Sequence, residues 1–190
     1  DDEIIYKRLM RAKEHLEKAS ETEVLGFRAP NFAINYDSPT QYKIIEKVFV
    51  YDSSLKAKSL DNVSRFKEKK GLKKLKIFPI YSKNFFGKSL RLGGTYLKMF
   101  PEIYAKMIIK SSKKNGIDPH IYLHPHEFGL SNDLKVNFTD LKILGNKKAI
   151  YWYLRQNQWL TFRNKSTVEK LTSLIKEYPL KGILKNNLDS

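Results

Sequence analysis

Apolar side chains recur at steps of three and four residues near the start of the chain, the spacing of one helix face. Residues 3–19 are therefore predicted to form an amphipathic surface helix, through Ile5, Leu9, Ala12, Leu16 and Ala19. Ser38 and Pro39 are typical of the cap and first position of a second, short helix. Similar patterns predict further helices over 101–114, 142–156 and 167–178.

Short apolar and β-branched runs alternate with these helices. They predict strands over 24–28, within 48–54 and 76–82, and over 120–124. The lysine-dense stretch 64–76 is interpreted as a solvated loop and strand edge, and the two glycines of LRLGGTYLKMFP as a tight turn or a backbone close to a ligand. Alternating strands and helices favour an α/β fold with a parallel sheet or barrel.

Composition narrows the classes of function. The 190 residues are 41% hydrophobic, enough for a globular core, and no apolar run is long enough to span a bilayer. Without cysteine, thiolate metal sites, cysteine nucleophiles and disulfides are excluded. The net charge of +16 comes mostly from scattered lysines, which AT-rich codons also produce, so no specific nucleic-acid partner is expected. The location is left open between the bacterial cytoplasm and the cell envelope.

The stretch GFRAPNF places Arg28 on a short, restricted segment. Pro30 fixes its own φ and pushes Ala29 towards an extended conformation, so Arg28 is expected to face a fixed partner. That partner is either a functional carboxylate or a structural ion pair at a strand end. Asp52, in YDSS, is open to a similar choice, since aspartate also forms turns and caps helices.

Three of the four histidines lie within DPHIYLHPHE. An extended segment would place His120, Tyr122 and His124 on one face, with His124 at the end of the strand. His120, His124 and His126 are a candidate zinc site, although His120 and His124 on a strand would lie too far apart to share an ion without a bend. Alternatively His124 is a general acid or base, or the histidines are structural.

Four motifs in order, GFRAPNFAI, VYDSSL, GGTYLKMFP and IYLHPHE, resemble the polysaccharide deacetylase family, the NodB-homology domains of carbohydrate esterases. The resemblance implies a distorted (β/α) barrel and metal-dependent hydrolysis of N-acetyl groups on a polymeric amino sugar. It assigns Arg28 to orienting the catalytic aspartate and His124 to the general acid. Substrate-binding positions implied by the resemblance are Pro30, Phe32, Tyr51, Asp52, Tyr96, Tyr122, His126 and Glu127.

The chain departs from the family pattern at its start. The family's base aspartate and its two metal histidines precede the first helix and are not found here, and Asp1-Asp2 has no following His-x-x-x-His. We therefore expect residues 1–190 to be one N-terminally incomplete domain, with a core over about 1–130 and a helical extension over about 131–190. The missing N-terminal segment would supply the ligands of the divalent metal, expected to be zinc, and the chain alone would be inactive.

A second hypothesis belongs to the binding class. A catalytically degenerate module of this charge would hold an anionic glycan or nucleic acid. The shared presence of Arg28 and His124 favours the enzyme, whose substrate would be an N-acetylated glycan.

Overall fold

The computed structural model describes residues 2–85, 88–129 and 135–188. The chain forms two compact units, and each is described by itself. The first comprises Asp1–Ser89, Ser112–Asp118 and Lys181–Ser190, and the second comprises Leu90–Ser111 and Pro119–Leu180. The second unit draws residues from both the predicted core and the predicted helical extension, so the single-domain assignment stays a prediction.

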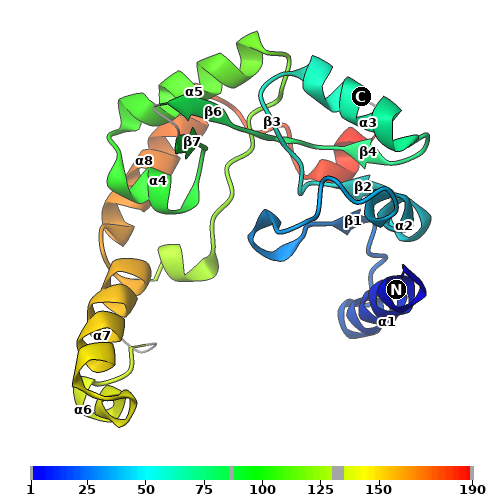
Figure 1. Ribbon diagram of the computed structural model, residues 1–190. Helices are drawn as coiled ribbons and strands as arrows, with labels where there is room; N and C mark the ends of the chain where they lie inside the picture. Colours follow the sequence, from blue (N-terminus) through cyan, green and yellow to red (C-terminus); the bar gives the residue numbers. More distant parts are fainter. Residues whose placement is uncertain (1, 86–87, 130–134, 189–190) are drawn as a thin grey trace. The chain divides into compact units, whose positions relative to one another are not determined.

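Short parallel strands organise the first unit (Figure 1). Three of them, β1 (Gly26–Phe27), β2 (Tyr51–Asp52) and β4 (Lys76–Ile77), form a sheet in the order β1-β2-β4. A second parallel pair joins β3 (Lys56–Ala57) to β5 (Ile80–Tyr81). The strands β6 (Lys83–Phe85) and β7 (Lys88–Leu90) form another two-stranded sheet. The general α/β prediction is confirmed, whereas the described strands form no closed barrel and the barrel type stays a prediction.

Pro79 divides the predicted strand 76–82 into two. Before it β4 pairs with β2, and after it β5 pairs with β3. Proline has no N–H to donate to a ladder, which accounts for the break at this position. The sequence therefore located the extended segment correctly but not its change of partner.

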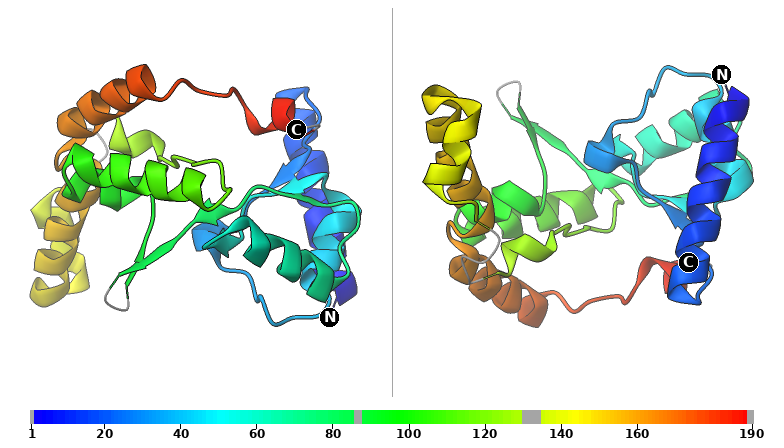
Figure 2. Two further views of the ribbon diagram at one scale, coloured as in Figure 1. Left: turned by 90° about the horizontal axis from the view of Figure 1, so that it is seen from above. Right: turned by 90° about the horizontal axis from the view of Figure 1, so that it is seen from below.

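Helices cover the first unit. The predicted first helix is confirmed as α1 (Asp2–Ser20), which packs on α2 (Gln41–Val48) (Figures 1 and 2). Helix α2 begins after the predicted Ser38-Pro39 start, and the Ser38 hydroxyl accepts a hydrogen bond from the Gln41 N–H at 3.2 Å. The side chains that α2 buries are Tyr42, Ile44, Ile45 and Val48.

The prediction of a loop over 64–76 was wrong for most of its length. Residues Leu60–Lys70 form α3, which begins after the cap Ser59 and ends at Gly71, whose φ of 63° is left-handed. Lysine is a good helix former, and α3 buries Val63 and Lys70 while Lys69 is exposed. The capping residues Ser59 and Gly71 at its two ends indicate a helix more strongly than the density of lysines indicates a loop.

The second unit is mainly helical. The glycine-rich segment leads into α4 (Gly94–Met99), and α5 (Glu102–Lys114) belongs to this unit as far as Ser111. The later elements are η2 (Pro125–Glu127), α6 (Phe138–Leu141), η3 (Lys142–Leu144), α7 (Asn146–Leu160) and α8 (Asn164–Glu177). The helices predicted over 101–114, 142–156 and 167–178 therefore exist as α5, α7 and α8, with shifted ends for the last two.

The predicted strand over 120–124 was wrong. This segment makes one isolated parallel bridge, between Tyr122 and Gly93, and turns into η2 at Pro125. Proline at 119 and 125 limits the backbone donors available for a longer ladder. Because this segment is not a strand, the expectation that His120, Tyr122 and His124 share a strand face was also wrong.

A carboxylate holds the turn that enters β4. Glu46 of α2 accepts hydrogen bonds at one oxygen from the backbone N–H groups of Lys73, Lys74 and Leu75, at 2.7, 2.7 and 2.9 Å. Burial opposes ionisation of Glu46, but the three N–H groups outweigh it and lower its pKa below 4.5. Ionised Glu46 therefore ties α2 to the sheet.

Replacing Glu46 with alanine is expected to lower the free energy of unfolding by about 1–3 kcal/mol, because three backbone donors lose a charged acceptor. Glu46→Gln should cost less, since its amide oxygen still accepts. A depressed pKa means that the stabilisation is complete above pH 4.5 and is lost as the pH falls through the folded-state pKa. Urea unfolding and exchange of the Leu75 amide proton across this pH range test the prediction. The difference in free energy of unfolding between wild type and Glu46→Ala should become smaller in acid, and a difference that stays constant would contradict the prediction.

Candidate functional site

Arg28 lies just beyond β1, next to the residue that follows β2. Its Nε donates a hydrogen bond to the Ser53 hydroxyl at 2.9 Å, and its guanidinium carbon lies 5.9 Å from the centre of the Phe32 ring. The side chain is exposed. Arg28 is thus exposed and contacts a hydroxyl and an aromatic ring, and its charge also interacts with Asp52.

Asp52 is fully buried and braces the Arg28 loop through Ser54. Its two carboxylate oxygens accept from the Ser54 N–H at 2.9 Å and from the Ser54 hydroxyl at 2.6 Å. That hydroxyl in turn accepts the Ala29 N–H at 2.8 Å. Burial raises the pKa of Asp52, and the Ser54 hydrogen bonds and the charge of Arg28 oppose the increase. Asp52 therefore stabilises the Arg28 loop through Ser54. Its assignment to substrate binding stays a prediction.

The loop itself has an unusual backbone. Pro30 is exposed at the start of η1 (Pro30–Phe32), and Asn31 and Phe32 have φ values of 54° and 55°. A left-handed conformation is costly for a bulky residue such as Phe32, and its buried ring helps to hold it there. Gly26 is also constrained, because a Cβ there would lie 2.0 Å from the ring of Tyr51.

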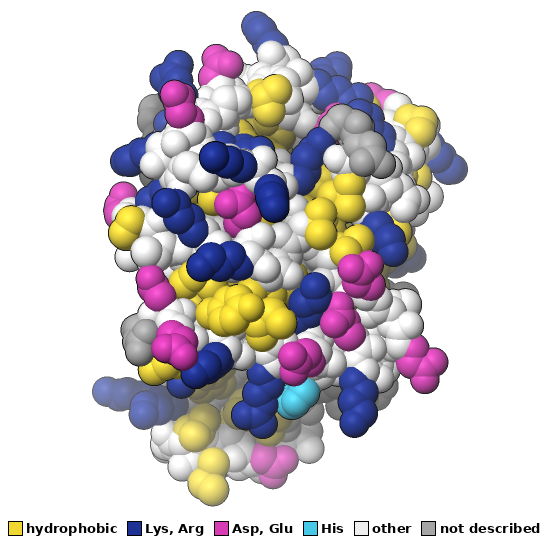
Figure 3. All heavy atoms as spheres, turned by 90° about the vertical axis from the view of Figure 1, so that its right-hand side faces the viewer, with side chains coloured by type: hydrophobic (Ala, Val, Ile, Leu, Met, Phe, Trp, Pro, Cys, Tyr) yellow, Lys and Arg dark blue, Asp and Glu magenta, His cyan; other side chains and the backbone are white. Residues whose placement is uncertain are grey.

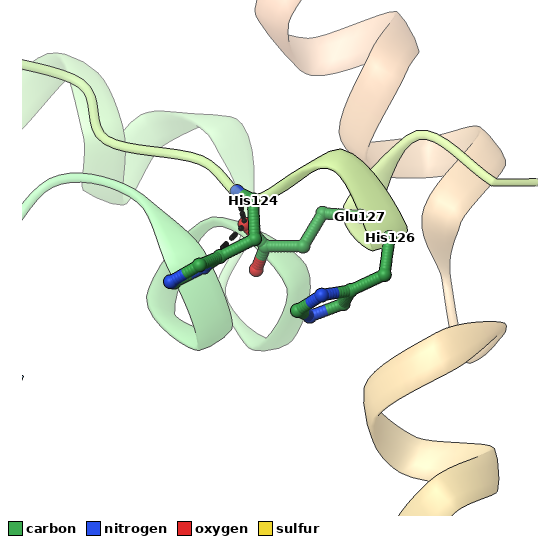
Figure 4. Close-up of side chains that lie close together, drawn as sticks. All are labelled: His124, His126 and Glu127. Carbon is green, nitrogen blue, oxygen red and sulfur yellow. Dashed lines mark hydrogen bonds and ion pairs between the residues drawn. The ribbon is translucent and has the colours of Figure 1, made fainter. Parts of the chain in front are cut away.

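A second group of predicted residues lies in the second unit, on the turn His124-Pro125-His126-Glu127. The buried carboxylate of Glu127 accepts the His124 N–H at 2.7 Å, and the same oxygen lies 3.5 Å from Nδ1 of His124. The rings of His124 and His126 stack with centres 5.2 Å apart. Figure 4 shows the Glu127 carboxylate between the two imidazoles.

The electrostatic partner of this turn is Lys98 of α4, only 3% exposed. Its Nζ donates to the Trp159 carbonyl at 2.6 Å; burial lowers its pKa, and the charge of Glu127 opposes that decrease. Burial, aided by the charges of His124 and Lys98 and opposed by Glu127, also lowers the pKa of His126. Burial at this turn therefore disfavours the protonated form of His126.

Asn164 anchors the turn from the first position of α8. Its side-chain amide donates to the carbonyls of His126, Gly129 and Leu160, at 2.8, 2.5 and 2.6 Å. Sequence reasoning missed both Asn164 and Lys98. Lys98 had a detectable signal, as the charged residue in the apolar run YLKMF, whereas nothing local marked Asn164, 38 residues from its partner.

The remaining predicted residues of the second unit are Tyr96 and Tyr122. Gly93 approaches the backbone of Tyr122 so closely that a Cβ would lie 2.2 Å from the Tyr122 oxygen, and the N–H of Gly94 donates to that oxygen at 2.9 Å. The glycine pair thus adapts to the chain's own backbone. Tyr96 stacks on Tyr104, with ring centres 6.3 Å apart. The structure therefore joins Tyr122 to the histidine turn through the start of α4.

The predicted residues form two groups. Arg28, Pro30, Phe32, Tyr51 and Asp52 belong to the first unit, and the second unit contains the others, namely Tyr96, Tyr122, His124, His126 and Glu127. In the described part of the chain, the group of three or more metal-binding side chains comprises His124, His126 and Glu127. It lacks the aspartate and His-x-x-x-His of the resembled family, so the described residues do not supply that family's metal site.

Comparison with protein-family models, with curated proteins and with solved structures gives no match for this chain. The four motifs and the two residue groups therefore carry the functional argument. No described helix is both long and apolar enough to cross a membrane. On the face in Figure 3, basic side chains are interspersed with acidic ones, and no single large basic patch dominates.

Ser54→Ala is expected to destabilise the first unit by about 1–3 kcal/mol, because it removes the hydroxyl that accepts the buried Ala29 N–H and donates to Asp52. Ser53→Ala is the matched control: it removes only an exposed arginine's partner and should cost less than about 1 kcal/mol. Urea unfolding followed by circular dichroism measures both. Equal losses in the two variants would show that Ser54 does not brace the loop.

Proposed function

We propose that this chain contributes an arginine and an acid histidine to a hydrolase that removes acetyl groups from an N-acetylated polysaccharide or oligosaccharide. The bond cleaved is a linear amide C–N bond. The observation that carries the proposal is the paired histidine-carboxylate turn, in which Glu127 fixes the backbone of His124 while 60% of the His124 side chain remains exposed. The order of the four sequence motifs gives it a substrate class.

His124 has the properties of a general acid. Expulsion of an amine from a tetrahedral intermediate requires a proton, and an imidazolium near neutrality can supply it. The Glu127 carboxylate, 3.5 Å from Nδ1, is placed to stabilise that imidazolium. Exposure of the ring leaves its other nitrogen accessible to a substrate.

Arg28 is assigned to orienting the catalytic carboxylate. Its Nε donates to the Ser53 hydroxyl at 2.9 Å, and this hydrogen bond restricts the direction of the exposed guanidinium. The described residues supply neither the catalytic base nor the metal ligands that the family resemblance implies. No step proposed here depends on that ion. The complete protein is therefore the form in which activity is proposed.

His124→Ala in the complete protein is expected to lower kcat for acetate release from an N-acetylated oligosaccharide by about 10² or more, the scale of general acid catalysis. His15→Ala, at an exposed position of α1, is the control and should leave kcat unchanged. Acetate is measured by a coupled enzymatic assay under saturating substrate. Full activity of the His124 variant would refute the assigned role.

Exposed aromatic residues on α7 favour a second candidate, a basic module that binds an anionic glycan or nucleic acid. Tyr151, Trp152, Tyr153 and Trp159 are each at least 40% exposed, on a chain of net charge +16. Stacking on such rings combined with lysine contacts is a common way to hold a polymer.

If the binding function is correct, affinity for an anionic polymer should fall about tenfold or more between 50 and 200 mM salt. The reason is that releasing counterions from the polymer contributes less free energy of binding at higher salt. Trp152→Ala should weaken binding, whereas Ile143→Ala, also exposed, should not. Fluorescence anisotropy with a labelled polymer provides the measurement. Salt-independent binding, or none, would leave the hydrolase as the sole candidate.

A further inference from the structure

We propose that His124, His126 and Glu127 form a zinc-binding site of their own, separate from the metal centre that the family resemblance implies. An ion held by the His124 imidazole would displace the proton that the proposed general acid carries, so zinc at this site would inhibit the proposed deacetylation. Two imidazole nitrogens and one carboxylate oxygen make a His₂Glu donor set, which suits zinc and leaves a coordination position open for water. The ligand atoms of the three side chains all lie within 4.8 Å of one another. The sequence alone indicates His120, His124 and His126 as candidate zinc ligands. In the structure Glu127, and not His120, lies close to the other two histidines.

The separations are close to those of an occupied site. Zinc bonds of about 2.0–2.2 Å in a tetrahedron place neighbouring ligand atoms about 3.3–3.6 Å apart. Nδ1 of His124 and the Glu127 oxygen already lie 3.5 Å apart. The other ligand-atom separations are at most 4.8 Å, and zinc binding requires them to shorten. A side-chain rotation of His126, which is only half-buried, would shorten them.

The carboxylate can bind an ion without releasing the turn. One Glu127 oxygen accepts the His124 N–H at 2.7 Å, but a carboxylate has about four acceptor positions on its two oxygens. The backbone beneath the ligands is held independently, since Asn164 binds the carbonyl of His126 at 2.8 Å. The backbone of the turn is therefore held before the ion arrives, which reduces the ordering cost of binding.

Donor chemistry selects the ion. Calcium and magnesium prefer sets made of oxygen, whereas imidazole suits zinc and its first-row neighbours. His124 is the most exposed of the three, with 60% of its side chain accessible, so the open position faces solvent. The buried Lys98 acts against the ion, because its charge interacts with Glu127.

Zinc titration of the metal-free chain, with Co²⁺ absorption as a second readout, tests the proposal without any assay of activity. One ion per chain is expected, and His126→Ala and Glu127→Gln should each weaken binding by about tenfold or more. Glu127→Gln retains an oxygen that accepts the His124 N–H, so the turn is preserved. His120→Ala is the matched control and should retain wild-type affinity. Unchanged affinity in His126→Ala, or an equal loss in His120→Ala, would overturn the site.

Lys98→Met gives an independent check. It keeps the aliphatic stem and removes the ammonium group near Glu127, so zinc should bind more tightly if the carboxylate is a ligand. Circular dichroism confirms that the variant is folded. Unchanged or weaker affinity in the folded variant would contradict the proposed coordination, and because binding is measured directly, that result is distinguishable from failure of the proposed deacetylase function.

Discussion

A carboxylate withdrawn from water must be matched by donors, and this constraint shapes both candidate regions. In the first unit Asp52 is satisfied by Ser54, whose hydroxyl then takes the Ala29 N–H and fixes the loop that presents Arg28. In the second unit Glu127 accepts the backbone N–H of His124 and interacts with the charge of the buried Lys98. In both cases an acidic side chain that contacts little solvent determines the position of a basic side chain that contacts much of it. The residues best placed for chemistry are therefore not the ones that hold the structure together.

Glu46 follows the same logic at a purely structural position. Its carboxylate collects three backbone N–H groups where the chain enters β4, so an α-helix and a two-residue strand are joined without a long ladder. Strands this short contribute few hydrogen bonds of their own. Side chains that bind backbone groups from a distance, such as Glu46, Ser54 and Asn164, supply much of the missing connection.

Sequence patterns located most helices because apolar spacing and capping residues are local properties. They failed where the outcome depended on a remote partner or on competing signals. The lysines around α3 obscured Ser59 and Gly71, which mark its two ends. The run around His120 has strand-forming residues, but the strand pairing described there is one isolated bridge, between Tyr122 and Gly93. Likewise the HPHE motif identified His124, His126 and Glu127, whereas the role of Asn164 depends on a fold-determined contact that no local pattern records. The division of the predicted residues into two groups follows from the compact units and was not visible in the motif order.

The hydrogen bonds of Asn164 have a practical consequence for where the chain can be shortened. Its amide ties three carbonyls, including those of His126 and Gly129, to the first turn of α8. A version that retained every recognisable motif but stopped after IYLHPHE would keep the imidazoles and discard their anchor. A piece that keeps this anchor must therefore extend to Asn164 at the start of α8, well beyond the last residue of the motifs.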